Sequence, residues 1–396
     1  MSKVMAVNAG SSSLKYQLIE MPAAELLCQG IVERIGLNDS IFTIEVNGEK
    51  HKDVLDINDH TKAVELVLEA LTKFNVVKEL SEINGVGHRV VHGGEEFVTS
   101  VVINDKVEET IERLSDLAPL HNPANLVGYR AFREALPNVG HVAVFDTAFH
   151  QTMAKDTYVY PIPYEYYSDY GVRKYGFHGT SHLFVSQRAI EMLGNPKSSK
   201  VITCHLGNGA SLAAVKDGKS INTSMGLTPL AGVMMGTRSG DIDPAIITFI
   251  MDKTGMSAHD VINVLNKKSG MLGLSQISSD ARDVEDAYRD GNELAGLTID
   301  VYINRIVDTI GSYIAKLGGV DAIVFTAGLG ENGILFREKV INSLTEAFGI
   351  KIDNERNNVR GKETVISSDD SSAKVFLIPT NEELVIAQDT TKLLGL

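Results

Sequence analysis

Two arginines stand inside glycine-rich segments, where an anion could reach them. Arg89 lies in GHRVVHGG at 87–94, and Arg238 lies in GTRSG at 236–240. A planar guanidinium group binds a carboxylate or a phosphoryl group through two hydrogen bonds and keeps its charge at neutral pH. One such arginine could equally form a structural salt bridge at the end of a strand. The repetition of the pattern favours an anionic substrate.

Histidines recur in three further motifs, LHNP, FHQ and YGFHGTSH, which begin at residues 120, 149 and 175. Any one of them could be a buried structural histidine. Their spacing is not that of the HExxH zinc motif, but scattered ligands could converge in the fold, so a zinc hydrolase stays an alternative.

Asp146 follows the apolar run 143–145. It should emerge at the end of a strand, where α/β sheets hold their ligands, or else cap a helix.

Three glycine-rich turns are expected after strands, at residues 8–13, 205–209 and 327–333. Such turns bring backbone N–H groups close to phosphate oxygens. None of them matches the P-loop or the GxGxxG dinucleotide pattern, so a phosphate site of another architecture is needed. Lys15, just beyond the first turn, is either a charged contact of that site or a surface residue.

The composition narrows the range of partners. Asp and Glu outnumber Lys and Arg by 51 to 37, for a net charge of −14. This charge disfavours nucleic acid and anionic membranes as partners, and an anionic substrate then requires a local cationic pocket. Cys28 and Cys204 are far apart, which argues against a disulfide framework or a structural zinc site and predicts a cytoplasmic protein. No apolar run approaches the ~20 residues of a membrane helix.

These residues must be positioned by a larger framework. A length of 396 residues predicts two or three domains, and two is the simpler expectation. A strand, turn, strand unit at 4–19 recurs at 201–215, and aligning Asn8 with His205 also aligns Gly10 with Gly207. The two units open the two halves of the chain, as in a duplicated lobe, although glycine turns between strands also recur by chance.

The remaining pattern predicts helices over 61–74, 301–317 and 382–394, and a strand over 322–325. Asp59 should cap the first helix, and Gly318 should end the second. The Tyr- and Pro-containing stretch 150–170 is interpreted as a loop-rich entry to the second lobe.

Taken together, these motifs resemble those of the acetate kinase family along the whole chain. The segments that carry the resemblance are 7–15, 87–94, 145–150, 175–182, 205–211, 235–244, 278–280 and 379–383. The departures are mild: Ala154 stands where a proline is usual, and Ala231 where an acidic residue is common. Neither lies at an expected catalytic position.

The resemblance implies the α/β fold of actin, sugar kinases and chaperone ATPases. This fold has two duplicated lobes, each with a ribonuclease H-like βββαβαβα core, and a nucleotide cleft between them. The first lobe is expected at 1–150 and the nucleotide-binding lobe at 151–382, with a last helix at about 383–396 that packs back on the first lobe. The family also implies a homodimer.

The implied activity is reversible, Mg²⁺-dependent transfer of a phosphoryl group from ATP to acetate, giving acetyl phosphate and ADP. A propionate or butyrate kinase shares every motif and differs in pocket volume. A methylene group in such a pocket is worth only ~1–3 kcal/mol, so acetate should be preferred without excluding propionate. A slow ATPase that acts as a conformational machine is an alternative of another class. It would need a peptide-binding domain, for which the resemblance leaves no room.

The resemblance assigns roles to particular residues. Those expected to act in catalysis are Arg89, His121, Asp146, His178 and Arg238. The acid should bind at Arg89, Val91, Leu120, Phe177 and Pro229. The nucleotide should bind at Lys15, His205, Leu206, Gly207, Asn208, Gly209, Asp280, Ala281, Arg282, Ala327, Gly328, Leu329, Gly330 and Glu331. The Mg²⁺ ion, for which Mn²⁺ can substitute, should bind at Asn8 and Glu382.

A carboxylate acceptor is already ionised at neutral pH, so no base has to remove a proton. Catalysis should instead overcome the repulsion between two anions and align them. Arg89 and Arg238 suit this task, while His178 is expected to donate a hydrogen bond to the phosphoryl group with support from His121. Asp146 is expected to orient an arginine or a metal-bound water.

Overall fold

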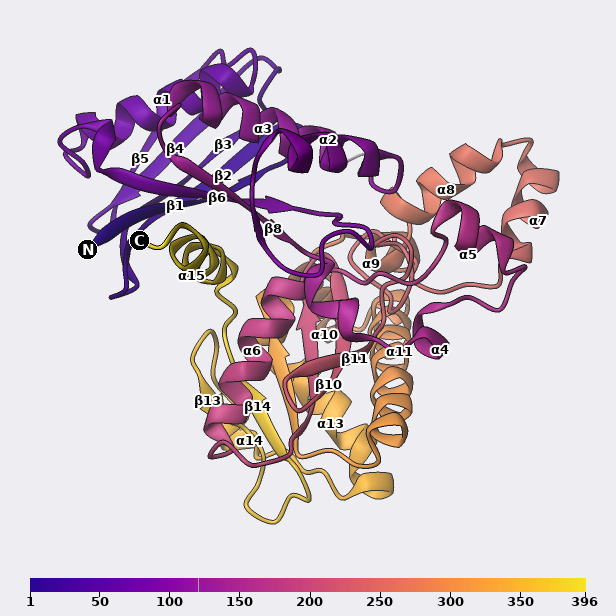
Figure 1. The fold of residues 1–396 in the computed structure, drawn as a ribbon. Helices are drawn as coiled ribbons and strands as arrows, with labels where there is room; N and C mark the ends of the chain where they lie inside the picture. The colour runs from indigo at the N-terminus through magenta and orange to yellow at the C-terminus, as the bar shows by residue number, and fades with distance from the viewer. Residues whose placement is uncertain (120) are drawn as a thin grey trace. The chain divides into compact units, whose positions relative to one another are not determined.

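The structure, a computed structural model, describes residues 1–119 and 121–396. The chain forms two compact units (Figure 1). The first unit comprises Met1–Phe149 and Asn381–Leu396, and the second comprises His150–Thr380. Among the described residues, no helix combines the length and the apolar character needed to cross a membrane.

The first unit is built on an eight-stranded sheet of order β5-β4-β3-β2-β1-β6-β8-β7. Its strands are β1 (Ser2–Ala9), β2 (Ser13–Met21), β3 (Glu25–Glu33), β4 (Ser40–Val46), β5 (Glu49–Leu55), β6 (Ile83–Val90), β7 (Val101–Val102) and β8 (Gly140–Phe145). Strands β1 to β5 form an antiparallel meander, whereas β1, β6 and β8 run parallel. The carboxyl ends of these three parallel strands therefore meet at one edge, which places Asn8, Arg89 and Asp146 together.

Helices cover both faces of this sheet. They are α1 (His60–Lys73), α2 (Asp105–Arg113), α3 (Asn122–Ala135) and α15 (Glu382–Leu394), with short 3-10 turns at Leu80–Glu82 and Leu114–Asp116. Side chains alternate between the faces of β1. Met5 and Val7 join a core with α1 and α3, whereas Val4 and Ala6 join cores with α15. The predicted helix at 382–394 is confirmed, as is the cap Asp59, whose side chain accepts from the backbone N–H of Lys62.

The second unit contains a six-stranded sheet of order β11-β10-β9-β12-β14-β13. Its strands are β9 (Lys200–Leu206), β10 (Ala210–Lys216), β11 (Lys219–Thr223), β12 (Ala322–Thr326), β13 (Thr364–Val365) and β14 (Lys374–Leu377). Strands β11, β10 and β9 are antiparallel, and β9, β12 and β14 are parallel. The order β11-β10-β9-β12-β14 thus repeats β3-β2-β1-β6-β8 of the first unit. The predicted α/β class with duplicated, ribonuclease H-like sheets is confirmed.

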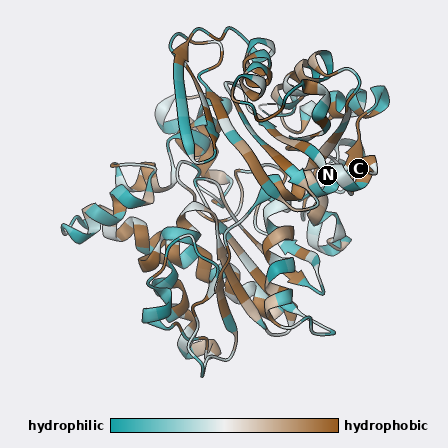
Figure 2. Ribbon diagram, turned by 90° about the vertical axis from the view of Figure 1, so that its left-hand side faces the viewer, coloured by the Kyte–Doolittle hydropathy of each residue, from teal (hydrophilic) through white to brown (hydrophobic). Residues whose placement is uncertain are grey.

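The helices of the second unit are α4 (Lys155–Tyr158), α5 (Glu165–Tyr170), α6 (Gly179–Met192), α7 (Ala245–Thr254), α8 (Ala258–Lys267), α9 (Gly270–Ser275), α10 (Ala281–Arg289), α11 (Glu293–Leu317), α12 (Ala327–Asn332), α13 (Ile334–Phe348) and α14 (Asn354–Asn357). A 3-10 helix, η3 (Ala148–Thr152), lies at the boundary of the two units. Helix α11 ends at Gly318 in the left-handed conformation (φ 68°), as predicted. In Figure 2 hydrophobic residues run along many of the strands, and hydrophilic residues are frequent on the helices and loops.

Two local predictions were wrong. The stretch 150–170, predicted to be loop-rich, contains η3 and the short helices α4 and α5. The stretch 327–333, predicted to be a turn, contains α12. Its first residue, Ala327, has a positive φ of 63°, and the backbone N–H of Ala327 donates to the Glu331 carboxylate (2.9 Å). This side-chain contact across one helical turn closes the start of α12.

Candidate active site

Arg89 and Asp146 form a two-pronged ion pair at the carboxyl edge of the first-unit sheet. Nε of Arg89 donates to Oδ1 of Asp146 (2.8 Å), and Nη2 donates to Oδ2 (2.6 Å). Nη1 of Arg89 donates to Oδ1 of Asn8 (3.1 Å). The Asp146 side chain is 1% exposed and that of Arg89 is 23% exposed. This geometry holds the plane of a guanidinium group that is still open to solvent.

Burial and neighbouring charges shift the pKa values of both Asp146 and Arg89. Burial raises the pKa of Asp146, while the positive charge of Arg89 acts in the opposite direction. Burial alone would lower the pKa of Arg89, but the carboxylates of Asp146, Glu382 and Glu383 raise it. Arg89 therefore remains a cation, and it is the positive end of a site with several carboxylates close by.

The first turn of α15 contributes to the same unit. Asn381 caps the helix by accepting from the backbone N–H of Leu384 (3.0 Å), so that Glu382 and Glu383 lie in its first turn. Glu383 forms an ion pair with Lys15 of β2. Lys15, predicted to contact the nucleotide, is thus engaged with a carboxylate in this structure.

Two asparagines of α3 position the Arg89 segment, and the sequence interpretation missed them. Asn125 accepts from the backbone N–H of Val91 (3.0 Å) and donates to the carbonyl of Ala9 (2.7 Å). Asn122 both accepts from and donates to the backbone of His92 (3.0 Å each). Both side chains are buried. Two asparagines in one turn of an otherwise apolar helix face were the available signal, because a buried amide needs partners.

Among the predicted acid-binding residues of this unit, Val91 is buried and its backbone is held by Asn125. His121 precedes α3, and its charge acts on the pKa of Asp146. Leu120 lies outside the described residues.

In the second unit, His178, Gly209 and Arg238 converge. A Cβ atom placed on Gly209 would lie 3.4 Å from both the His178 ring and Nη1 of Arg238. His178 has a positive φ of 56° at the start of α6 and stacks on His205, with ring centroids 4.1 Å apart. The absence of a side chain at Gly209 therefore lets the arginine and the histidine approach the same backbone.

Arg238 is a partly buried cation. Among the described residues, its side chain donates to two neutral groups, the carbonyl of Pro229 (3.2 Å) and Sδ of Met235 (3.6 Å). Burial lowers the pKa of Arg238. A partly buried charge whose partners are neutral groups gains free energy from an anionic ligand. Pro229, predicted to line the acid pocket, contacts this arginine through its carbonyl, whereas Phe177 is buried next to His178.

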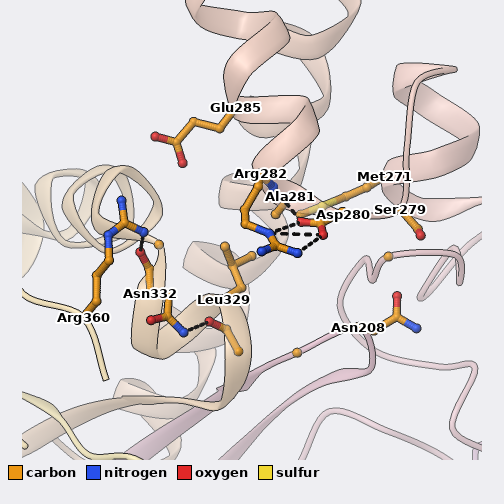
Figure 3. Close-up of a pocket in the computed structure, with 14 residues that line it drawn as sticks. Asn208, Met271, Ser279, Asp280, Ala281, Arg282, Glu285, Leu329, Asn332 and Arg360 are labelled. Atoms are coloured by element: carbon orange, nitrogen blue, oxygen red, sulfur yellow. Dashed lines mark hydrogen bonds and ion pairs between the residues drawn. The ribbon is translucent and has the colours of Figure 1, made fainter. Parts of the chain in front are cut away.

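A pocket of about 580 Å³ opens in the same unit (Figure 3). Seven of the predicted nucleotide-binding residues line it: Gly207, Asn208, Asp280, Ala281, Arg282, Gly328 and Leu329. Asp280 caps α10 through the N–H of Arg282 (2.9 Å) and pairs with the Arg282 guanidinium group (2.5 Å). A cavity of this size suits a nucleotide.

The other predicted nucleotide-binding residues of this unit do not line the pocket. They are His205, Leu206, Gly209, Ala327, Gly330 and Glu331. Glu331 accepts from the N–H groups of Ala327 (2.9 Å) and Thr380 (3.2 Å), and the carbonyl of Gly330 accepts from buried Arg337 (2.9 Å). These residues shape α12, which in turn presents Gly328 and Leu329.

The pocket also contains lining residues that the sequence interpretation missed: Gly236, Met271, Ser279, Glu285, Asn332, Gly333 and Arg360. Gly236, Ser279, Asn332 and Gly333 belong to segments already singled out, so the sequence could have predicted them. Glu285, Met271 and Arg360 come from separate helices and loops, and only the fold brings them together. Arg360 is held by the carbonyl of Asn332 (2.6 Å), as Figure 3 shows.

The sequence model of the Acetokinase family matches residues 3–388. The chain is 61% identical to the acetate kinase of Geobacillus kaustophilus (strain HTA426), over 100% of both chains. It is 59% identical to the acetate kinase of Bacillus subtilis (strain 168), over 99% of this chain and 100% of the relative.

Solved structures agree with these sequence matches. The fold is similar to that of Porphyromonas gingivalis acetate kinase, with a TM-score of 0.95 and 49% identity over 100% of both chains. It is also similar to a propionate kinase from Francisella tularensis subsp. tularensis SCHU S4, with a TM-score of 0.94 and 42% identity over 99% of this chain and 100% of the other.

Proposed function

The chain belongs to the acetokinase family, and we propose on this premise that it transfers the terminal phosphoryl group of ATP to acetate, giving acetyl phosphate and ADP. The observation that carries the proposal is the guanidinium group of Arg89, which Asp146 and Asn8 hold at the edge of the first-unit sheet. It provides an oriented cation for a carboxylate or a phosphoryl group. The reaction is reversible, because an acyl phosphate is itself a phosphoryl donor.

The hydrogen-bonding capacity of Arg89 supports this role. A guanidinium group has five N–H donors, and among the described residues Asp146 and Asn8 use three of them. One N–H remains on each Nη atom. A carboxylate or a phosphoryl group can accept from such a pair of N–H groups end-on. Asp146 thus serves as an orienting group, and no proton transfer through Asp146 is required, since the acid is already ionised.

Arg238 and His178 have complementary roles in the proposed mechanism. Arg238 neutralises charge on the phosphoryl oxygens during transfer, because the partners of this partly buried cation among the described residues are neutral. His178 donates a hydrogen bond to the same group, and His121 supports it. For the acid, the proposed binding residues are Val91, Phe177 and Pro229.

The nucleotide is proposed to bind in the pocket of the second unit, with its adenosine near Asp280, Arg282 and Leu329.

Mg²⁺, or Mn²⁺ in its place, is proposed to accompany the phosphates. Asn8 and Glu382 would hold it through the amide and carboxylate oxygens that hard cations prefer. Within the described part of the chain, no group of three or more His, Cys, Asp or Glu residues could hold a metal ion. A metal that arrives with ATP would neutralise phosphate charge.

We also propose a homodimer and a cytoplasmic location. The dimer is supported by α7, an apolar helix on which Ile246 and Phe249 are 40% and 62% exposed. The location is supported by Cys28 and Cys204, which are both buried free thiols. Light scattering of the purified protein, with Phe249→Glu as the variant expected to be monomeric, tests the dimer.

The proposed activity is tested by trapping the acyl phosphate with hydroxylamine, in parallel reactions with acetate, propionate, butyrate and no acid. We expect hydroxamate formation that depends on ATP, on Mg²⁺ and on the acid, with acetate preferred. A preference for propionate would favour the second candidate, a propionate kinase, to which the fold is also similar. Release of ADP at the same rate without any acid would indicate an ATPase instead.

A further inference from the structure

We propose that Thr203, His182 and Ser211 form a hydrogen-bond chain that holds His178 in its neutral Nε2–H tautomer. In this form Nε2 of His178 always carries a hydrogen and can donate it in a hydrogen bond. The consequence for catalysis rests on the proposed function, in which His178 donates to the phosphoryl group. Thr203, His182 and Ser211 are then positioning residues that act through His178.

The hydrogen-bond chain is continuous and runs from the core of the second unit to His178. Oγ1 of Thr203 lies 2.7 Å from Nδ1 of His182, and Nε2 of His182 lies 2.7 Å from Oγ of Ser211. Oγ of Ser211 lies 2.8 Å from Nδ1 of His178. Thr203, His182 and Ser211 are each 0% exposed. Thr203 and Ser211 belong to the neighbouring strands β9 and β10, so the sheet itself sets the spacing.

Thr203, at the buried end of the hydrogen-bond chain, determines the direction in which the hydrogen bonds are donated. Among the described residues, His182 is the hydrogen-bond partner of the Thr203 hydroxyl, and a buried O–H group must donate. The hydroxyl therefore donates to Nδ1 of His182. Burial lowers the pKa of His182 well below its usual range, and the nearby rings of His150 and His205 act in the same direction. His182 is thus neutral, with its proton on Nε2.

The remaining steps follow from the valence of each group. Nε2–H of His182 donates to Oγ of Ser211, which leaves the Ser211 hydroxyl hydrogen to donate to Nδ1 of His178. A neutral imidazole whose Nδ1 accepts must carry its proton on Nε2. The opposite direction would leave the buried hydroxyl hydrogen of Thr203 without an acceptor.

The surroundings hold His178 in place for this role. His150, also buried, donates from Nε2 to the carbonyl of Phe177 (3.0 Å) and accepts at Nδ1 from the Ser220 hydroxyl (2.8 Å). These bonds anchor Phe177, the residue before His178. The backbone of His178 itself is left-handed. Oγ of Ser181 lies 2.7 Å from Nδ1 of His205, the ring that stacks on His178.

The test is the tautomer of His178 in protein labelled with ¹⁵N-histidine, measured by two-bond ¹H–¹⁵N correlation. The resonance is assigned by its loss in His178→Gln. Thr203→Val removes the hydroxyl but keeps the shape, and Thr203→Ser restores the hydroxyl. We expect the Nε2–H form in the wild type and in Thr203→Ser, and a clear Nδ1–H population in Thr203→Val. In Thr203→Val, kcat should fall about tenfold, while KM for ATP and acetate stays within about twofold.

An Nδ1–H or doubly protonated His178 in the wild type would overturn the proposal, as would an unchanged tautomer in Thr203→Val. If that variant does not fold, Ser211→Ala provides the same readout by removing the direct partner of His178. The tautomer of His178 is measured without substrate. A change of tautomer in Thr203→Val would therefore support the hydrogen-bond chain even if the wild type lacked kinase activity. The inference and the proposed function can therefore fail separately.

Discussion

At the scale of single residues, Arg89 and Arg238 illustrate two ways of holding a cation for an anionic substrate. Arg89 is oriented by a buried carboxylate, and Arg238 is partly buried and donates to neutral groups. The first arrangement provides a defined direction of hydrogen bonding. The second provides a charge whose compensation must come from a ligand.

Replacing Arg89 tests the value of the oriented guanidinium group. Arg89→Ala should lower kcat by about three orders of magnitude, because the charge and both end-on donors are lost. Arg89→Lys keeps a charge but cannot bind with two prongs, so its kcat should stay at least ~10-fold below the wild type. Arg113→Lys, at a 63% exposed side chain, is the matched control. Near-normal turnover of Arg89→Ala would remove this residue from the mechanism.

Replacing Asp146 tests orientation separately from charge. Asp146→Asn keeps the size but replaces one acceptor with an NH₂ group that faces the guanidinium donors of Arg89. We expect kcat to fall about 100-fold, with little change in nucleotide binding to the second unit. Steady-state kinetics with calorimetric titration of ADP checks both quantities. A wild-type kcat would mean that Asn8 alone orients Arg89.

The residues of the site differ in how far the sequence predicts them. Arg89, Asp146 and Arg238 stand in motifs whose chemistry can be interpreted locally. Thr203 and Asn125 do not, because their importance lies in partners far along the chain. A buried polar residue on an apolar strand or helix was the available signal for both.

At the scale of secondary-structure elements, local signals predicted helix ends well. Asp59 caps α1, Gly318 ends α11, and α15 spans the predicted residues. These ends depend on neighbouring residues only. The helix α12 was missed because Glu331 and the fully buried Arg337 hold it through side-chain contacts to Ala327 and Gly330. Composition alone favoured a glycine turn there.

The packing of α15 on the first-unit sheet depends on small residues of β6. A Cβ atom on Gly87 would lie 2.3 Å from Oγ1 of Thr390 and 2.4 Å from Cγ2 of Ile386. Gly87→Ala should therefore lower the free energy of unfolding by about 1–3 kcal/mol. Gly311→Ala, in open space within α11, should instead raise it by about 0.5–1 kcal/mol. Urea denaturation measures both, and equal stability of the two variants would contradict the close packing.

The nucleotide pocket depends on a glycine in a comparable way. A Cβ atom on Gly236 would lie 2.1 Å from Oδ1 of Asn208 and 3.0 Å from the carbonyl of Ser279, and all three residues line the pocket. Gly236→Ala should raise KM for ATP at least fivefold, or ~1 kcal/mol, while KM for acetate changes less. Gly311→Ala again serves as the control. A rise confined to the acetate KM would argue against nucleotide binding in this pocket.

At the scale of the whole molecule, buried histidines link stability to pH. Burial lowers the pKa of His141 and His150 to about 4 and that of His88 and His182 well below the usual range. The unfolded chain, with histidine pKa values of about 6.5, binds more protons below that pH. Stability should thus be fully present above pH ~6.5 and be lost as the pH falls toward the folded-state values.

Each of these histidines should contribute a slope of up to ~1.4 kcal/mol per pH unit between pH ~6.5 and its folded-state pKa. Urea denaturation at pH 7.0, 6.0 and 5.0 measures the loss. His141→Gln should reduce the slope, whereas His259→Gln, at an exposed position, should leave it unchanged. A free energy of unfolding that does not decrease between pH 7.0 and 5.0 would show that these histidines are protonated in the folded state.

In the proposed reaction a carboxylate oxygen attacks the terminal phosphorus of ATP. This step is tested by ³¹P NMR of the purified protein with ATP, Mg²⁺ and acetate that carries ¹⁸O in both carboxylate positions. We expect an acyl phosphate resonance displaced upfield by a single phosphorus–¹⁸O bond, since the bridging oxygen comes from the acid. Formation of inorganic phosphate at a rate independent of acetate, with no acyl phosphate signal, would contradict it.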